Sequence, residues 1–350
     1  MKKVGVLTGG GDCPGLNATI RAVVRKGIKD YNYKMYGILE GWRGLIDWKI
    51  KEMDMYSVSG ILHRGGTILG TSRTNPFADG NKGDPEKILE NIKALDLYAI
   101  VAIGGDDTQG VAYKLSEMGV NVVGIPKTID NDILCTDYTF GFDTAVNIVT
   151  EAIDRLHTTA ESHNRVMVVE VMGRHAGWIA TFAGIAGGAD IIMIPEKPVD
   201  MEDVYQSITR RHKHGKKFSI IVVSEGVQIP VADQENSGFV LQSSKTDAFG
   251  HVMLGGVGSV LANMIEKRTG FETRCTVLGH TQRGGTPTAF DRILSTRFGI
   301  AAIESIHKGE FAKIVALKGN DIISVDLKDI IGQNKTVNDY WYNIAKVFFS

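Results

Sequence analysis

The segment PKTIDND, residues 126–132, brings a lysine and two aspartates into one short stretch of chain. Lys127 is a candidate cation for binding a phosphate. Asp130 is a candidate general base, because a carboxylate can take the proton of a reacting hydroxyl. Thr128 and Asp132 stand beside them. A solvated turn seldom gathers these side chains, so the segment predicts a proton acceptor next to a phosphate-binding cation.

Two glycine-rich segments could bind phosphate through their backbones. Thr8–Gly15 reads TGGGDCPG, and Gly104–Thr108 reads GGDDT. Successive glycines let backbone N–H groups approach an anion, and the start of a following helix adds positive potential. Asp106 is a candidate Mg²⁺ ligand, since this ion prefers carboxylate oxygens. Two plainer interpretations remain open: an ordinary tight turn for the first segment, and helix capping by Asp106 and Asp107 for the second.

Cationic side chains recur near the ends of the predicted strands. Because the net charge of the chain is only −1, a local cluster of cations predicts a focused anion-binding pocket. Arginine suits phosphate, which it grips with two parallel hydrogen bonds. Each one alone is more often part of a surface ion pair, so the prediction depends on their shared position at the ends of strands. The residues are Arg73, Arg165, Arg174, Arg274, His280 and Arg283.

Short apolar runs alternate with helix-period segments through most of the sequence. This alternation predicts an α/β fold whose mainly parallel sheets are covered by helices on both faces. Helices are predicted over 16–28 and 111–118, with a loop over 104–110. The glycine-rich and aspartate-bearing segments each follow a strand, which is where ligands bind in such folds. The predicted strands are 3–7, 98–103, 121–125, 166–171, 218–224 and 274–278.

Length and composition exclude several classes of protein. A chain of 350 residues suits one large α/β unit or two lobes, and its charge gives no overall attraction to nucleic acid or to an anionic membrane. No apolar run approaches the roughly 18 residues of a membrane span. The three scattered cysteines favour a reducing compartment, so a cytoplasmic location is expected. The stretch 228–250 predicts an insertion or mobile loop, and residues 340–342 a packed terminal helix.

Six ordered motifs resemble those of the 6-phosphofructokinases. They are GGGDCPGLN, RGGTILGTSR, GGDDT, PKTIDND, VEVMGRHAGW and VLGHTQRGG. The resemblance runs from residue 3 to about residue 310. It implies two lobes that exchange chain, each with a mainly parallel sheet between helices. One lobe is expected to comprise 1–140 plus 282–330 and to bind the phosphoryl donor; the other is expected to comprise 141–281 plus 331–350 and to bind fructose 6-phosphate.

The resemblance also implies roles for single residues. Asp130 would accept the proton of the sugar C1 hydroxyl, assisted at the catalytic centre by Lys127, Asp107 and Arg174, and Asp106 would hold Mg²⁺. The donor would meet Gly11, Arg73, Gly105, Asp106, Asp107, Thr108 and Lys127. Fructose 6-phosphate would meet Thr128, Asp130, Asp132, Arg165, Met172, Gly173, Arg174, Glu225, Arg274, His280 and Arg283. Arg165 and Arg274 would reach in from a neighbouring subunit, which implies a homo-oligomer, either a dimer or a tetramer.

The phosphoryl donor depends on two positions. ATP-using members of the family usually read GGDG and PGTIDND, whereas this chain has Asp107 and Lys127 in place of the two glycines. Asp107 would fill the position of an ATP α-phosphate with bulk and negative charge, and Lys127 would replace a lost contact to the transferred phosphate. The pair resembles the pyrophosphate-dependent branch of the family. An ATP-dependent 6-phosphofructokinase is the alternative, and a non-catalytic sugar-phosphate sensor is a third possibility.

Overall fold

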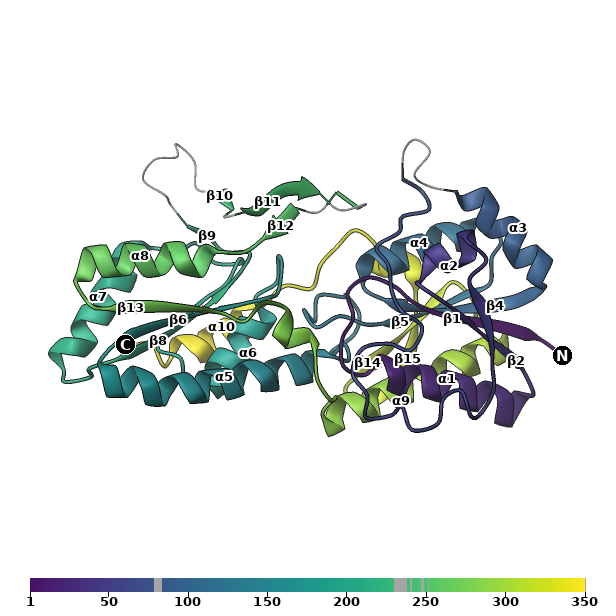
Figure 1. Cartoon of the computed structure of the whole chain (residues 1–350), viewed down its shortest axis with the longest axis horizontal. Coiled ribbons are helices and arrows are strands. Elements are labelled where there is room, and N and C mark those ends of the chain that lie inside the picture. The colour runs from purple at the N-terminus through teal and green to yellow at the C-terminus, as the bar shows by residue number, and fades with distance from the viewer. Residues whose placement is uncertain (79–83, 230–237, 240, 247–248, 251, 350) are drawn as a thin grey trace.

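The computed structural model describes residues 1–78, 84–229, 238–239, 241–246, 249–250 and 252–349. They form two lobes side by side, each built around a β-sheet with helices on both faces (Figure 1). The predicted α/β class is confirmed, and all six predicted strands are present with ends shifted by about one residue. No helix within these ranges is long and apolar enough to cross a membrane.

The first lobe contains a sheet with the strand order β15-β14-β5-β4-β1-β2-β3 among the described residues. Antiparallel strands lie at its two edges, β3 (Ile50–Met53) beside β2 and β15 (Asp321–Asp326) beside β14. The central strands are apolar and mostly buried, as expected for parallel strands covered on both faces. The parallel strands are β1 (Lys3–Thr8), β2 (Lys34–Ile38), β4 (Leu97–Gly104), β5 (Val122–Pro126) and β14 (Lys313–Lys318).

Helices cover both faces of this sheet. On one face, α1 (Leu16–Tyr31) packs along α9 (Ala289–Lys308), and α1 buries Leu16, Ile20 and Val23 at helical spacing. The opposite face carries α2 (Trp42–Ile46), α3 (Pro85–Leu95) and α4 (Asp106–Glu117) (Figure 1).

The second lobe has a sheet whose described strands are all parallel, in the order β13-β6-β8-β7. They are β6 (Val166–Val171), β7 (Ile191–Met193), β8 (Ser219–Ser224) and β13 (Thr273–Val277). The helices of this lobe are α5 (Phe142–His163), α6 (Trp178–Ala186) and α10 (Asp339–Lys346) on one face, and α7 (Met201–Lys213) and α8 (Val257–Thr269) on the other.

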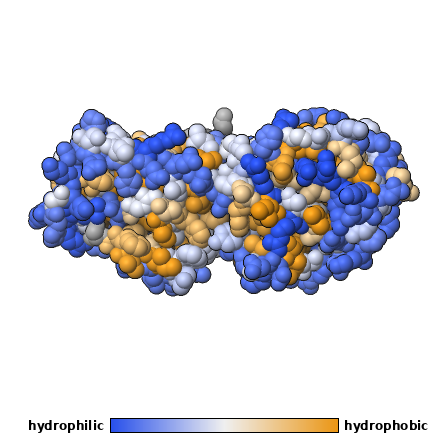
Figure 2. All heavy atoms as spheres, turned by 90° about the horizontal axis from the view of Figure 1, so that it is seen from below, coloured by the Kyte–Doolittle hydropathy of each residue, from blue (hydrophilic) through white to orange (hydrophobic). Residues whose placement is uncertain are grey.

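The chain passes between the lobes three times within the described ranges. The first passage, 127–141, leads from β5 to α5; the second, 284–288, leads to α9; the third, 331–338, leads to α10. The predicted terminal helix is confirmed by α10, where the Trp341 ring lies 4.6 Å from that of Phe182. In the view from below, apolar residues emerge on both lobes between hydrophilic ones (Figure 2).

One prediction from the sequence is partly wrong, and another falls partly outside the described residues. The loop predicted over 104–110 is wrong beyond Gly105, because α4 already begins at Asp106. Two carboxylates in the first turn favour a helix start there, since they meet the positive end of the helix. Of the predicted insertion 228–250, residues 230–237, 240 and 247–248 lie outside the described residues. Its remainder includes the short strands β9 (Gln228–Ile229), β10 (Gly238–Phe239) and β11 (Leu241–Thr246), the last paired with β12 (Val252–Leu254).

Candidate active site

The carboxyl ends of the two sheets face each other across a polar region between the lobes. Two adjoining cavities lie there and share Arg73, Arg174 and Arg283. The aspartate cavity, about 90 Å³, is lined by Gly10, Gly11, Arg73, Gly105, Asp106, Asp107, Thr108, Lys127, Thr128, Asp130, Asp132, Arg174, His175, Arg283 and Asn334. The glutamate cavity, about 160 Å³, is lined by Arg73, Glu170, Val171, Met172, Arg174, Glu225, Leu254, Gly255, Gly256, Val277, Gly279, His280 and Arg283.

The turn from β4 into α4 places two carboxylates at the aspartate cavity. Asp106 and Asp107 form the first turn of α4, directly after Gly105. Gln109, one turn further, is fully buried and donates hydrogen bonds to the carbonyls of Ala102, Gly104 and Ile125. It therefore fixes the start of α4 against the ends of both β4 and β5.

Thr108 sets the packing of the first glycine-rich turn against this helix. Its side chain is buried, and a Cβ atom built on Gly9 would lie 2.5 Å from its hydroxyl oxygen. A Cβ atom on Gly104 would lie 2.3 Å from the Thr108 Cβ. Both positions therefore need glycine so that the two turns can approach each other closely.

Lys127 lies between the two glycine-rich turns. Its side chain is 3% exposed, and the ammonium donates a hydrogen bond to the carbonyl of Gly11. Burial lowers the pKa of Lys127, with the nearby Arg283 guanidinium acting in the same direction. A phosphate in this cavity would offset that burial, because it would give the ammonium an anionic partner.

The loop after β5 places two further carboxylates in the same cavity. Asp130 is 4% exposed, and its Oδ1 atom has no hydrogen-bond partner among the described residues. Its backbone N–H donates to the Thr128 hydroxyl at 3.0 Å, which holds the loop in a tight turn. Burial and, after it, the charge of Asp130 raise the pKa of Asp132. An acceptor atom left unpaired in a buried polar site is the arrangement expected of a group that awaits a ligand.

The segment after β6 forms the wall between the cavities. Arg174 has φ = 51°, a conformation that costs a non-glycine residue energy and is concentrated at functional sites. Its backbone N–H donates to Glu225 Oε1 at 3.2 Å. A Cβ atom on Gly226 would lie 1.7 Å from the Arg174 carbonyl oxygen, so only glycine fits there. Burial, followed by the charge of Asp130, raises the pKa of Glu225 to about 7.

The short helix η1 (Gly279–Arg283) reaches from the second lobe to the first. The Arg283 guanidinium donates to the Asp12 carbonyl at 3.4 Å and lies so close to Gly11 that a Cβ atom there would be 2.4 Å from Nη1. Gln282 is fully buried, and its Oε1 accepts a hydrogen bond from the Met172 N–H at 3.3 Å. The helix thus fixes the Met172 segment and carries a cation to the glycine-rich turn.

Most of the predicted site residues line these two cavities, but Gly173, Arg165 and Arg274 do not. Gly173 is the chain neighbour of Met172 and Arg174, which do line them, whereas the two arginines lie elsewhere. Arg165 precedes β6 and pairs with Glu272 at 2.7 Å, and Arg274 is the second residue of β13 and pairs with the same carboxylate at 2.6 Å. At about 3.3 Å per residue, the extended chain of β6 separates Arg165 from Met172 by about 23 Å. The prediction that all six cationic residues gather in one pocket is therefore wrong within a single chain.

Three polar or charged side chains that line the cavities are absent from the predicted site. His175 adjoins Arg174, and Asn334 comes from the third passage. Glu170 is the last residue but one of β6 and accepts hydrogen bonds from the N–H groups of Gly256 and Gly258 at 2.8 Å. The position of Glu170 at the end of an apolar strand was a usable signal. Asn334 carried none, because only the fold brings its segment to the β5 loop.

The carboxylates of the aspartate cavity also suit a Mg²⁺ ion. No group of three or more His, Cys, Asp or Glu side chains that could hold a metal occurs in the part of the chain that the structure describes. Mg²⁺ needs no such group, since it usually takes one or two carboxylates and completes its shell with water and phosphate oxygens. Asp106, Asp107 and Asp130 offer that donor set.

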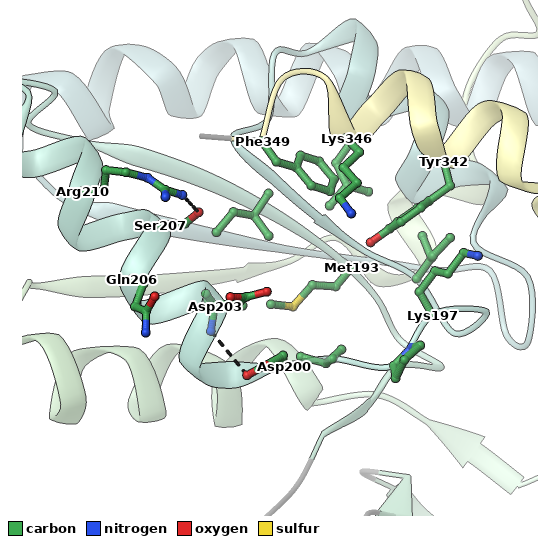
Figure 3. Close-up of a pocket in the computed structure, with 16 residues that line it drawn as sticks. Met193, Lys197, Asp200, Asp203, Gln206, Ser207, Arg210, Tyr342, Lys346 and Phe349 are labelled. Carbon is green, nitrogen blue, oxygen red and sulfur yellow. Dashed lines mark hydrogen bonds between the residues drawn. The ribbon is translucent and has the colours of Figure 1, made fainter.

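A third cavity, about 490 Å³, lies elsewhere in the second lobe, beside β7 and between α7 and α10 (Figure 3). Lys197, Arg210, Tyr342 and Lys346 project around it, and Arg210 donates to the Ser207 hydroxyl at 3.2 Å. It is the largest of the cavities described here, yet none of its described lining residues belongs to the predicted site. The carboxylates and glycine-rich turns instead favour the two cavities between the lobes as the candidate active site.

Comparisons with known proteins agree with this geometry. Residues 3–306 match the phosphofructokinase family. A relative from Streptomyces coelicolor named pyrophosphate–fructose 6-phosphate 1-phosphotransferase is 56% identical over 348 residues, 99% of both chains. Another from that organism, named ATP-dependent 6-phosphofructokinase 3, is 47% identical over 346 residues, 98% of this chain and 99% of its own.

Among solved structures, phosphofructokinase from Saccharomyces cerevisiae superposes with a TM-score of 0.80 at 31% identity. The match covers 99% of this chain and 47% of the yeast chain, so this chain spans about half of that protein. The family match covers residues 3–306, and the 56% identical relative is matched over 99% of both chains. The chain therefore belongs to the phosphofructokinase family.

Proposed function

We propose that the protein transfers a phosphoryl group from pyrophosphate to the C1 hydroxyl of fructose 6-phosphate, giving fructose 1,6-bisphosphate and phosphate. We expect this glycolytic reaction to be reversible. The observation that carries the proposal is the presence of Asp107 and Lys127 in one cavity, next to the buried Asp130. The 56% identical relative bears the name of this activity.

The aspartate cavity suits a compact donor. Asp107 stands in the first turn of α4, where by family resemblance a nucleotide α-phosphate would lie, and its carboxylate repels that phosphate. Lys127 is almost fully buried, so its ammonium interacts strongly with an anion bound beside it. Gly11, Arg73, Gly105 and Thr108 complete the proposed donor site.

The transfer itself needs a proton acceptor and groups that stabilise charge. Asp130 takes the C1 hydroxyl proton as that oxygen attacks phosphorus, the phosphoanhydride bond breaks and phosphate leaves. Lys127 and Arg174 stabilise the charge on the moving group. Asp106 holds Mg²⁺, which when bound neutralises charge on the phosphate oxygens.

The glutamate cavity holds the sugar phosphate in this proposal. Arg174, His280 and Arg283 supply positive charge, and Met172 lines the wall. Gly173 lies between Met172 and Arg174 in the chain and is proposed to bind the sugar phosphate with them. Glu225, with its pKa raised to about 7, is partly protonated at neutral pH and can donate a hydrogen bond to a sugar oxygen as well as accept one. Thr128 and Asp132 border the reacting end of the sugar from the other cavity.

A donor assay on purified protein tests the function. With fructose 6-phosphate and Mg²⁺, kcat/KM for pyrophosphate should exceed that for ATP at least about tenfold, since Asp107 repels a nucleotide. The relative named as ATP-dependent supports ATP as the second candidate donor. Faster turnover with ATP would select that candidate. Sugar-phosphate binding without turnover on either donor would indicate a sensor.

We further propose that each active site is shared between two subunits of a homo-oligomer. Arg165 and Arg274 lie far from the cavities of their own chain. Arg165 directly precedes β6, and Arg274 is on β13, an edge strand of the second sheet among the described residues. Placed against a second copy, these arginines could reach the partner's glutamate cavity and bind the sugar phosphate there. The three free cysteines agree with a cytoplasmic site of action.

Mixing two inactive variants tests the shared site. After subunit exchange, Arg165→Ala and Asp130→Ala together should recover activity, because the Arg165→Ala subunit keeps Asp130 and borrows Arg165 from its partner. The control mixture of Arg165→Ala with Arg274→Ala should stay inactive, since no site can then receive both arginines. Equal activity of the two mixtures, with exchange verified, would contradict a shared site.

We propose that the two lobes bind different substrates. Residues 1–140 plus 282–330 would bind the donor, and 141–281 plus 331–350 would bind fructose 6-phosphate. Sheet membership supports the division, because β14 and β15 join the sheet of β1, β4 and β5, and α10 packs on α6.

A further inference from the structure

The third passage between the lobes, residues 331–338, lies against the loop that carries the proposed base. The Lys335 ammonium donates hydrogen bonds to Asn131 Oδ1 at 3.0 Å and to the carbonyls of Thr136 and Asp137 at 2.9 Å. The Lys335 N–H also donates to the Asp132 carbonyl at 2.8 Å. We propose that Lys335 is a positioning residue, which holds Asp130 and Asp132 in their reactive placement by fixing Asn131.

Asn131 is the residue through which this contact acts. It lies between the two aspartates, is 2% exposed and has φ = 52°. A left-handed conformation at a non-glycine residue persists only where its surroundings enforce it. The Asn131 Oδ1 accepts hydrogen bonds from Lys335 and from the Thr139 N–H at 3.1 Å. Loss of the Lys335 contact frees Asn131 to relax, and both neighbouring carboxylates move with it.

The environment of Lys335 agrees with a fixed, directional role. Lys335 is half-buried, and its ammonium donates to three oxygens and lies 5.3 Å from the centre of the Trp178 ring. Enclosure by the protein lowers the pKa of Lys335 to about 8. An ammonium held this way loses hydration and side-chain freedom, so its geometry is well defined. Lys318 contacts the same loop differently, with a side chain that is 68% exposed and 3.4 Å from Asp137.

The same segment also holds the wall between the cavities. The Trp178 indole N–H donates to the Lys335 carbonyl at 2.8 Å. Glu196 Oε1 accepts hydrogen bonds from the N–H groups of Val337 at 2.8 Å and Gly177 at 2.9 Å. Gly177 and Trp178 follow Arg174 and His175 in the chain, with only Ala176 between them. Lys335 therefore links the loop of the proton acceptor to the loop that grips the sugar phosphate.

This inference rests on the proposed function, and its test is a set of variants of the full-length protein. Lys335→Met keeps the length of the side chain and removes the ammonium. It should lower kcat by about 10- to 100-fold, because a misplacement of about 1 Å costs that much, while KM for fructose 6-phosphate changes less than about threefold. Asn131→Ala should lower kcat similarly. Lys318→Met is the matched control and should keep kcat within about twofold.

A double variant separates positioning from general destabilisation. If Lys335 acts through Asn131, the double variant Asn131→Ala/Lys335→Met should be no slower than the slower single variant. Lys335→Arg retains the charge and should recover part of the lost kcat. Multiplied effects in the double variant, or a kcat for folded Lys335→Met within twofold of the parent, would overturn the inference. Should Lys335→Met fail to fold, Lys335→Arg and Asn131→Ala decide the outcome, and unchanged kcat in both rejects it.

Assays of the parent enzyme distinguish failure of this inference from failure of the proposed function. Turnover of the parent with ATP alone would reject the proposed donor, yet the Lys335 series would proceed with ATP. A parent without any phosphoryl transfer would reject the proposed function and, with it, a catalytic role for Lys335.

Discussion

Asp130→Ala should lower kcat for transfer from pyrophosphate by about 10²–10⁴-fold, because it removes the only proposed acceptor of the hydroxyl proton. Binding of fructose 6-phosphate should largely survive, since the sugar phosphate is held by arginines outside this loop. Kinetics with pyrophosphate and calorimetric titration with fructose 6-phosphate measure the two effects. Near-normal turnover of the variant would remove Asp130 from the role of base.

Asp130→Asn serves as the control for shape. It keeps the volume of the side chain but accepts no proton, so its kcat should fall as far as that of the alanine variant. At pH 8 its thermal midpoint should equal or exceed that of the parent. Burial and, after it, the charge of Asp130 raise the pKa values of Asp132 and Glu225 above their unfolded values, so the folded protein loses stability as pH rises from about 4 to about 7. Removing the charge relieves part of that loss, whereas a purely structural residue would show a lower midpoint.

Asp107→Gly and Lys127→Gly together should shift the enzyme from pyrophosphate toward ATP. Asp107→Gly removes the bulk and charge that keep a nucleotide out, so kcat/KM for ATP should rise. Lys127→Gly removes a cation beside the moving group and should lower kcat with pyrophosphate by about 10²-fold or more. The ratio of kcat/KM for ATP to that for pyrophosphate should therefore be highest in the double variant.

Two isosteric variants identify the cause of the shift. Asp107→Asn keeps the bulk, so any gain with ATP reports the charge alone. Lys127→Met fills most of the buried space, which separates loss of the ammonium from a packing defect at a residue only 3% exposed. A parent that already prefers ATP, or an unmoved ratio in Asp107→Gly, would contradict the proposed donor site.

The strands and the site loops were predictable because their signals are local. Buried parallel strands are continuous apolar runs, and the polar segment after each run marks its carboxyl end, as at Pro126 and Val171. The start of α4 at Asp106 was missed because glycines and acidic residues resemble a loop in the sequence. The structure shows instead that the acidic pair begins the helix.

Contacts between distant segments could not be predicted. Nothing in residues 331–338 indicates that Asn334 lines a cavity or that Lys335 meets Asn131, because these contacts arise only when the chain returns to the β5 loop. For Arg165 and Arg274, the sequence instead predicted a contact that the fold of one chain does not form. Their sequence neighbourhoods suggest a site, but their place in the fold excludes that site within one chain.

Because the chain passes between the lobes three times, the two sheets can be completed only at different stages of synthesis. The first sheet takes β14 and β15 from residues 313–326, so it stays incomplete at one edge until almost the whole chain has left the ribosome. The strands β6, β7, β8 and β13 instead come from one continuous segment between 166 and 277. The nascent chain can therefore close the second sheet before the first, and β5 remains an open edge, exposed to wrong pairing, until β14 emerges.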